Sequence, residues 1–431
     1  MGAGSRIAVT AAGALTTIVL ARLLGPAGWG TYFVAQSLFL LLTVLTGLGI
    51  EHGITYYVGS RRWDPRAAYS TALRVALLVG LGGAVVGLIA HALVPSAFAD
   101  LSLWLTAAVV AGLPFGLARF YLSYIALATD RYEAYAVMSA LQALLALALA
   151  VPGAALFGVE GAIVATTLAN VVVGVGAAAW AQRRLPGDEG AEPGQLRRAI
   201  SFGVKGYVAN ALQLLNYRLD LFILSAVTST AVVGRYSLAV AATTLMWLLP
   251  GALSEVLFPR VARLQSREEE VAREMVETKS VRHASLVAAS TGLLVAVALV
   301  FLVVPVFGED FRPSVTLGLI LLPGAALVGI SSVLAATIVG RGKPIFSLYG
   351  ALVVTPSTVL LYALFIPWLH AEGAALASTL SYAGSFVVTA WFYGRVTRRS
   401  ALPLLLPTRS EVDDLRAVPG AIRARLAAAR R

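Results

Sequence analysis

Polar side chains in an otherwise apolar segment, residues 200–227, are the best candidates for chemistry in this sequence. An α-helix turns by about 100° per residue, and this step places six of these side chains within an arc of about 140°. The six residues are Lys205, Asn210, Gln213, Asn216, Tyr217 and Asp220. A polar arc on an apolar helix needs a polar surface opposite it, either a water-filled cavity or a dry polar seam between helices. The pattern favours a cavity that holds a polar ligand.

Charged side chains deep within apolar segments form a second set of candidates. Arg119, Arg218 and Asp220 lie far from the ends of their segments, whereas Lys205 is close enough to an end to reach water along the helix. Arg218 falls outside the arc, because residues two apart do not share a helix face. Tyr121 and Tyr124, near Arg119, add hydroxyls and flat faces suited to sugars. We expect these residues to contact a ligand, or Arg119 and Asp220 to form a structural ion pair.

Two glutamates, Glu51 and Glu255, occupy equivalent places near the ends of two apolar segments. They are interpreted as contacts that close the cavity by pairing with arginines, or as proton-coupling groups. Catalytic machinery is not visible, because the chain has no cysteine, four scattered histidines, and neither a phosphate-binding glycine loop nor a catalytic triad. The prediction is therefore a protein that is not an enzyme and that uses no metal or cofactor.

The composition of the chain predicts the helices that position these residues. Of the 431 residues, 58% are hydrophobic and 13% are charged, against about a quarter charged in soluble domains. The mean hydropathy is +0.82. Apolar runs near 20 residues, enough to cross a bilayer, recur throughout and predict an all-α polytopic membrane protein. The twelve expected spans are 7–24, 31–57, 70–92, 101–127, 134–156, 160–181, 200–227, 232–258, 281–304, 314–339, 344–366 and 372–393.

The distribution of basic residues predicts the orientation of these spans. With the N-terminus inside, 26 of the 33 Lys and Arg residues fall on the inner side and two, Arg235 and Arg312, fall outside. Both termini are therefore expected in the cytoplasm, and the net charge of +11 reflects membrane topology, not nucleic-acid binding. The basic tail, 395–431, is interpreted as an arm near anionic membrane lipid.

An internal repeat divides the spans into two sets. Residues 159–168 recur at 371–380, and Gly30-Thr-Tyr32 matches Gly234-Arg-Tyr236. Two copies of six spans, each starting inside, are parallel repeats, which place a substrate site at their interface. The expected organisation is a first six-helix lobe, a cytoplasmic linker, a second six-helix lobe and a tail, over 1–182, 183–199, 200–394 and 395–431.

Three segments carry a resemblance to a known family: 21–32, 216–224 and 233–239. The sequence resembles the oligosaccharide flippases of the polysaccharide transporter family, in the superfamily that also contains multidrug extruders. This resemblance implies two six-helix lobes forming a V, a central cavity, and export of a polyprenyl-diphosphate-linked oligosaccharide across the cytoplasmic membrane by alternating access. Arg119, Lys205 and Arg218 would then face the diphosphate. The extra pair of spans typical of lipid II flippases is missing, which argues against a peptidoglycan precursor.

Other functions stay open at this point. A multidrug or cation antiporter of the same superfamily would need an acidic cavity, and one deep carboxylate, Asp220, against two deep arginines disfavours it. A membrane-embedded enzyme of a glycan pathway would need catalytic groups in the outer loops, where Glu309 and Asp310 are the only adjacent carboxylates. No nucleotide-binding domain is visible, so H⁺, Na⁺ or substrate supply would provide the energy.

Overall fold

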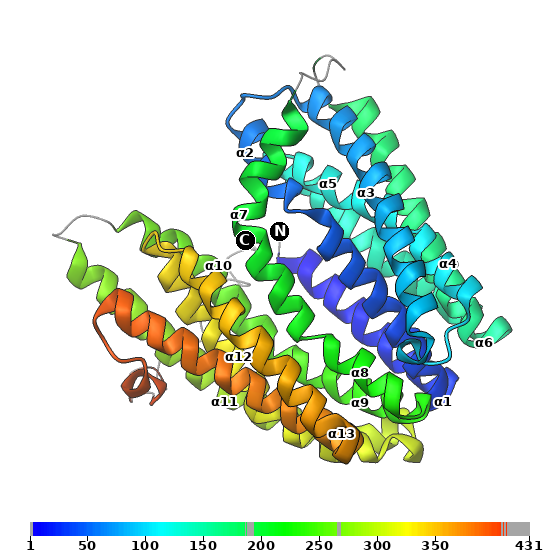
Figure 1. The fold of residues 1–431 in the computed structure, drawn as a ribbon. Helices are drawn as coiled ribbons and strands as arrows, with labels where there is room; N and C mark the ends of the chain where they lie inside the picture. The colour runs from blue at the N-terminus through cyan, green and yellow to red at the C-terminus, as the bar shows by residue number, and fades with distance from the viewer. Residues whose placement is uncertain are drawn as a thin grey trace, which may run out of the picture. The chain divides into compact units, whose positions relative to one another are not determined.

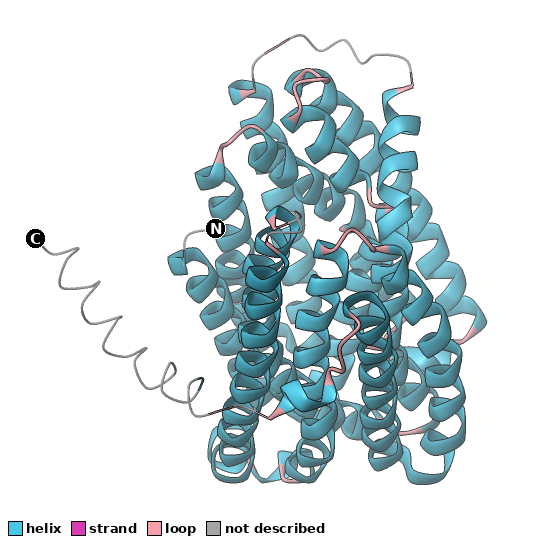
Figure 2. Cartoon of the chain, turned by 90° about the vertical axis from the view of Figure 1, so that its left-hand side faces the viewer, coloured by secondary structure: helices cyan, strands magenta, loops and turns pink. Residues whose placement is uncertain are grey.

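The computed structural model of this chain describes residues 3–185, 187, 194–264, 269–406, 408 and 411. Part of the predicted linker and most of the predicted basic tail lie outside the described residues, as does the side chain of Lys205. All regular secondary structure in the described part is helical (Figure 2). The all-α prediction is therefore confirmed.

The α-helices follow one another along the chain as labelled in Figure 1. They are α1 (Ala3–Gly47), α2 (Ile50–Gly59), α3 (Pro65–Leu93), α4 (Leu103–Ala111), α5 (Leu113–Ala128), α6 (Tyr132–Arg184), α7 (Gln195–Asn216), α8 (Leu219–Val227), α9 (Thr230–Thr244), α10 (Leu248–Arg263), α11 (Glu270–Phe307), α12 (Pro313–Gly340) and α13 (Ile345–Thr397). Short 3₁₀ turns are η1 (Pro95–Phe98), η2 (Leu245–Trp247), η3 (Glu309–Phe311) and η4 (Leu402–Leu405).

The described residues form two compact units. The first unit runs to Ser237 and includes 303–313 and 366–374, and the second unit holds the remaining residues from Leu238 onward. In the first unit, α2, α3, α5, α6 and α7 surround one apolar core. In the second unit, α10, α11, α12 and α13 surround another. The predicted lobes, 1–182 and 200–394, stay a prediction.

Eight helices in the described part are long and apolar enough to cross a membrane. This number is smaller than the twelve spans expected from the sequence. Three of the eight helices, α1, α6 and α13, each cover two expected spans, because they continue through a residue with non-helical backbone: Gly25 (φ 65°), Gly158 (φ 63°) and His370 (φ 50°). The seventh expected span is divided between α7 and α8, which do not meet the criterion.

The reversal inside α6 follows from its glycines. Gly158 adopts a positive φ that costs glycine little, and it separates two helical halves of about equal length. Gly153 and Gly161 then face each other so closely that a Cβ on Gly153 would lie 2.6 Å from the carbonyl oxygen of Gly161. Small residues permit this backbone approach. In α13, the two halves are joined by a hydrogen bond of 3.2 Å between the Tyr362 and Ser378 hydroxyls.

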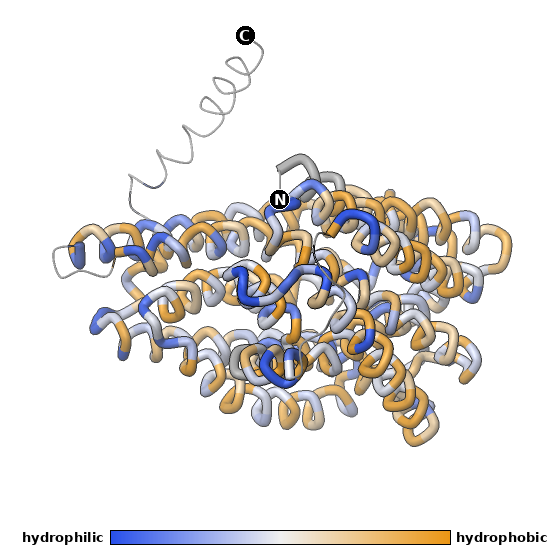
Figure 3. The backbone as a smooth tube through the Cα atoms, turned by 90° about the horizontal axis from the view of Figure 1, so that it is seen from above, coloured by the Kyte–Doolittle hydropathy of each residue, from blue (hydrophilic) through white to orange (hydrophobic). Residues whose placement is uncertain are grey.

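Large apolar side chains cover much of the outer surface of the helices. Phe157 is 72% exposed and Trp368 is 83% exposed. Hydrophobic residues predominate along the helices of both units, as the orange stretches of Figure 3 show. A soluble monomer rarely exposes contiguous apolar surface on this scale. The surface is therefore that of a protein embedded in lipid.

Candidate functional site

A break between α1 and α2 lies within the first unit. Gly49 has a left-handed φ of 68°, so the carbonyl groups at the end of α1 lose their helical partners. The Tyr207 hydroxyl donates to the Val44 carbonyl at 2.5 Å, and the Tyr121 hydroxyl donates to the Gly47 carbonyl at 3.2 Å. An unsatisfied carbonyl in hydrocarbon costs several kcal/mol. The two tyrosines therefore stabilise the break, and Tyr121 acts in packing rather than toward a sugar.

The helix α7 packs closely against this break. A Cβ on Gly203 would collide with the backbone of Gly49. A Cβ on Gly53 would lie 2.6 Å from the Ala199 carbonyl oxygen. Glycine at these places lets the backbones of α2 and α7 touch. This contact brings the first half of α7 directly against the break.

Glu51 lies in the first turn of α2, directly after the break. Its side chain is 3% exposed, and its Oε2 atom has no hydrogen-bond partner among the described residues. The His52 ring is the near group, with Nε2 at 3.7 Å from Oε1 of Glu51. Burial of a carboxylate is costly without pairing. Glu51 is therefore a buried acidic group held beside an irregular stretch of backbone.

Glu255, the predicted counterpart of Glu51, lies in α10 of the second unit. Its side chain is exposed, whereas Glu51 is buried. The two glutamates match in sequence position and differ in environment. Their shared role at a gate or in coupling stays a prediction.

The helix α5 carries Arg119 and Tyr124. Arg119 is partly buried, and its Nε atom has no hydrogen-bond partner in the described part of the chain. The Tyr124 ring contacts the rings of Phe120, His52 and Tyr135, with centroid distances of 5.1, 6.3 and 6.2 Å. The helices α2, α5 and α6 thus meet at an aromatic cluster beside a cation with an unused donor.

The polar arc predicted for 200–227 is interrupted. The helix α7 ends at Asn216, and Arg218 has a non-helical φ of −132° before α8 begins. The constant helical step therefore does not extend from α7 to Asp220. On α7 itself, Asn210 and Gln213 are exposed. The Gln213 amide donates to the Tyr217 hydroxyl at 2.7 Å.

The residues around this interruption face protein. Asn216 is 5% exposed and Asp220 is 2% exposed. The Asp220 carboxylate accepts hydrogen bonds from the Tyr236 hydroxyl and from the Leu221 backbone N–H, the latter at 2.7 Å. The hydrogen bond from Tyr236 joins α9 to α8. The Arg218 guanidinium lies 5.3 Å from the centroid of a phenylalanine ring in α1, and its Nε atom has no hydrogen-bond partner among the residues described.

A basic, aromatic pocket between α2 and α7 was not predicted from the sequence. Its volume is about 480 Å³, and it is lined by Tyr57, Gly194, Arg197, Arg198, Ser201 and Phe202. The Tyr57 ring stacks on Trp63 at 4.4 Å between centroids, and the Phe202 ring stacks on Tyr56 at 4.6 Å. Guanidinium groups bind phosphate and aromatic faces suit sugars. The sequence signal was present in Arg197 and Arg198, which we used only to assign orientation.

A buried ion pair in the second unit was also missed. Glu277 is fully buried, and both of its oxygens accept hydrogen bonds of 2.7 Å from Arg341. Arg341 also lies 3.2 Å from Glu270. Glu270 and Glu277 are seven residues apart on α11 and share a face. That spacing is visible in the sequence, whereas the partner on the loop after α12 is not.

Comparison with known proteins identifies the family. The model of a family described as polysaccharide biosynthesis protein matches residues 19–316, which is more than half of the chain. This chain belongs to that polysaccharide biosynthesis protein family. The resemblance stated from the sequence is therefore confirmed. No curated protein matches the sequence.

Solved structures show the fold of this family member. An inward-facing multidrug resistance MATE transporter of the MOP superfamily has a TM-score of 0.72 and 16% identity, covering 90% of this chain and 95% of that one. The lipid II flippase MurJ, inward closed, has a TM-score of 0.72 and 12% identity, covering 92% and 91%. A MOP transporter from Pyrococcus furiosus, described as having a binding pocket of reverse polarity, has a TM-score of 0.63 and 16% identity, covering 92% and 94%. The chain is a multi-pass membrane protein with this transporter fold.

Proposed function

We propose that this chain translocates a polyprenyl-diphosphate-linked oligosaccharide from the cytoplasmic to the outer leaflet of the cytoplasmic membrane, for assembly of a surface polysaccharide. It would act as a transporter, not as an enzyme. Membership of the polysaccharide biosynthesis family and the MOP transporter fold support this proposal. The observation that carries it is the basic, aromatic pocket of α2 and α7.

The chemistry of that pocket matches the proposed cargo. Arg197 and Arg198 offer planar donors to diphosphate oxygens, and such bonds are about twice as strong as neutral hydrogen bonds. Tyr57 and Phe202 offer ring faces to the first sugar. Deeper in the first unit, Arg119 retains an unused donor. We infer that the headgroup enters at the pocket and is then held by this deeper cation.

We also propose that the chain crosses the membrane twelve times, in two lobes of six, with both termini in the cytoplasm. The breaks at Gly25, Gly158 and His370 divide α1, α6 and α13 into two crossings each. The helices α7 and α8 together form one further crossing. Irregular backbone at membrane depth is tolerated where protein contacts satisfy it, as Tyr121 and Tyr207 do at the end of α1.

Glu51 is the group that we assign to coupling with H⁺ or Na⁺. It is the buried carboxylate beside the α1–α2 break, and its Oε2 atom has no hydrogen-bond partner among described residues. Binding of a cation there would remove an uncompensated charge, so it would change the energy of this conformation. The exposed Glu255 would have less effect.

Reconstitution tests the proposed function. Liposomes containing the protein and a fluorescent lipid-linked oligosaccharide should exchange that lipid between leaflets faster than empty liposomes. The double variant Arg197→Gln/Arg198→Gln should slow exchange by about tenfold, the loss expected when charge-assisted contacts are removed. The matched control is Arg260→Gln, which changes an exposed arginine of α10. This variant should exchange the lipid as fast as the wild-type protein.

Two results would count against the proposal. Exchange no faster than in empty liposomes would exclude flipping of that lipid. Exchange of an organic cation against a proton gradient, in the same liposomes and blocked by Glu51→Gln, would instead favour the multidrug antiporter. The structural likeness to MATE transporters makes that the second candidate.

A further inference from the structure

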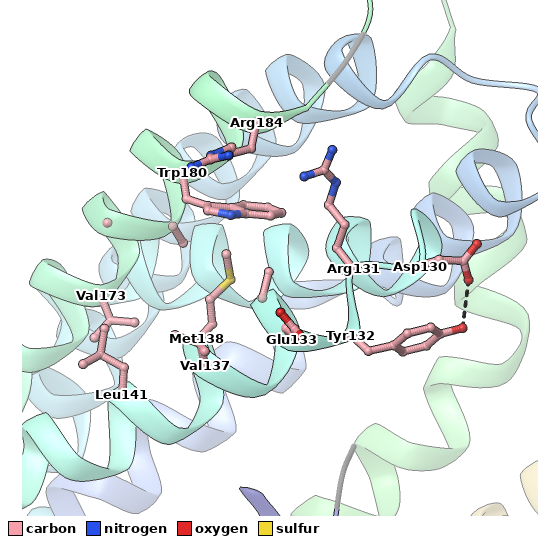
Figure 4. A pocket seen from close by; sticks show the side chains of 13 residues that line it. Asp130, Arg131, Tyr132, Glu133, Val137, Met138, Leu141, Val173, Trp180 and Arg184 are labelled. Atoms are coloured by element: carbon pink, nitrogen blue, oxygen red, sulfur yellow. Dashed lines mark hydrogen bonds between the residues drawn. The ribbon is translucent and has the colours of Figure 1, made fainter.

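An open groove lies between the two halves of α6, and the proposed transport function does not use it. Its volume is about 790 Å³, and its lining residues lie within 130–141 and 173–184, near the two ends of the helix (Figure 4). Charged and aromatic side chains lie at one end of the groove, and aliphatic side chains lie at the other. This order matches the order of headgroup and acyl chain in a phospholipid.

The charged end of the groove holds two arginines and one exposed glutamate. The Arg131 guanidinium lies 6.0 Å from the centroid of the Trp180 ring, and Arg184 lies on the same side of that ring. Glu133 lines the groove below them and is exposed. In the described part of the chain, no hydrogen bond or ion pair engages the side-chain charges of Arg131, Arg184 or Glu133. Two donors for phosphate therefore lie near one acceptor for an ammonium group.

The apolar end continues along the first half of α6. Val137 and Leu141 are 60% and 47% exposed, and Val173 forms part of the opposite wall. From Glu133 to Leu141, eight residues of helix extend about 12 Å, which spans a headgroup and the upper part of an acyl chain. Gly176 leaves open space, since a Cβ there would contact nothing within 4 Å. The groove therefore has open space beside its aliphatic side chains.

We propose that this groove binds one phospholipid with a phosphoethanolamine headgroup. Its phosphate lies between Arg131 and Arg184, its ammonium group donates to Glu133, and one acyl chain follows the aliphatic wall. Charge complementarity selects this headgroup: the lining contains two arginines with Glu133 and Asp130, so its formal charge is zero, like that of the zwitterion. A phosphatidylglycerol headgroup would offer Glu133 neutral hydroxyls in place of a cation, so the occupied groove would carry a net negative charge.

Neighbouring contacts favour a primary over a quaternary ammonium group. Arg131 already covers a face of Trp180, so that ring is not available for choline. Asp130 also lines the groove, and its carboxylate already accepts a hydrogen bond of 2.8 Å from the Tyr132 hydroxyl (Figure 4). Glu133 is left as the acceptor for the ammonium protons. The lipid would then connect the two halves of α6.

Native mass spectrometry of the purified, delipidated protein tests this proposal. Equimolar phosphatidylethanolamine, phosphatidylcholine and phosphatidylglycerol with identical acyl chains are added in detergent. The protein should retain one phosphatidylethanolamine about fivefold more than either other lipid. This is the ratio of affinities expected when one lipid makes one more charge-assisted hydrogen bond than the others. Arg131→Gln/Arg184→Gln and Glu133→Gln should each reduce this retention at least to that of phosphatidylcholine.

A groove-filling variant tests the position of the acyl chain. Gly176→Phe should abolish the preference, whereas Gly82→Phe, at another glycine with open space around it on α3, should retain it. Circular dichroism verifies that each variant is folded, and Glu133→Gln at an exposed site keeps the test valid if Gly176→Phe does not fold. Equal retention of the three lipids, a preference for phosphatidylglycerol, or an unchanged preference in Gly176→Phe would overturn the proposal. So would displacement of the lipid by inorganic phosphate alone. These readouts do not depend on transport, so they are independent of the proposed function.

Discussion

Replacing Arg341 with alanine removes the partner of a buried carboxylate in the second unit. Arg341 donates to both oxygens of Glu277 at 2.7 Å, and the Glu277 side chain is fully buried while that of Arg341 is 10% exposed. Removing one partner of a buried pair leaves an uncompensated charge and costs about 3–5 kcal/mol. The weaker contact of Arg341 with the partly exposed Glu270 adds less than about 1 kcal/mol. We therefore expect a destabilisation of several kcal/mol.

Unfolding of the purified protein in detergent, followed by tryptophan fluorescence, measures this cost. The matched control is Arg399→Ala, which breaks an ion pair of 3.0 Å to Glu274 whose side chains are 40% and 30% exposed. An exposed ion pair contributes about 0–1 kcal/mol, so the free energy of unfolding of the control variant should stay close to that of the wild-type protein. In the Arg341→Ala background, Glu277→Gln should recover part of the loss, because it removes the unpaired charge.

Two outcomes would refute this reasoning. If Arg341→Ala destabilised no more than Arg399→Ala, burial of Glu277 would not determine the cost. If Glu277→Gln further destabilised the Arg341→Ala protein, the loss would come from packing and not from an unpaired charge. The first result would mean that water reaches Glu277.

Three further predictions concern other parts of the chain. Tyr207→Phe removes the donor to the Val44 carbonyl and should lower the free energy of unfolding by about 1–3 kcal/mol in the same assay. Equal unfolding midpoints for the variant and the wild-type protein would contradict this. In a chain without cysteine, Gln213→Cys should react with a membrane-impermeant thiol reagent and Asp220→Cys should not, because Gln213 is exposed and Asp220 is buried; the reverse pattern would exclude a water-accessible face on α7. Hydrogen bonds from a nearby threonine lower the pKa of Glu411 from 4.5 to about 2, so its stabilisation should be complete above pH 4.5 and be lost as the pH falls toward 2. The difference in unfolding midpoint between wild type and Glu411→Gln should shrink over that range, and a constant difference would argue against the assignment.

The fold was largely predictable because apolar runs of about 20 residues have few alternatives to membrane helices. The number of separate helices was harder to predict. Gly158 is an ordinary signal for a reversal, but His370 adopts a positive φ that residues other than glycine take only rarely. The end of α7 at Asn216 was not predicted either, since neither glycine nor proline follows it. There the tertiary contact of α8 with α9, through Asp220, determines the backbone.

The candidate site was predictable only in part, for a related reason. Tyr121 was interpreted as a sugar contact, yet its hydroxyl serves the carbonyl of Gly47, 74 positions away in the chain. The basic, aromatic pocket joins Tyr57 with Arg197 and Arg198 through the packing of α2 on α7. Such pairings depend on long-range contacts, which residue patterns within one segment do not contain. Single buried polar residues could be found from the sequence, and their partners could not.

The glycine contact between α2 and α7 has a consequence for biogenesis. The helix α7 is not among the eight described helices that are apolar enough to cross a membrane by composition, so it gains little from entering lipid alone. Its backbone instead fits against α2 at Gly49 and Gly53, which are synthesised about 150 residues earlier. Integration of α7 should therefore wait until α1–α6 are in place. A nascent chain arrested before that point would hold α7 outside the bilayer, where quality-control proteases can reach it.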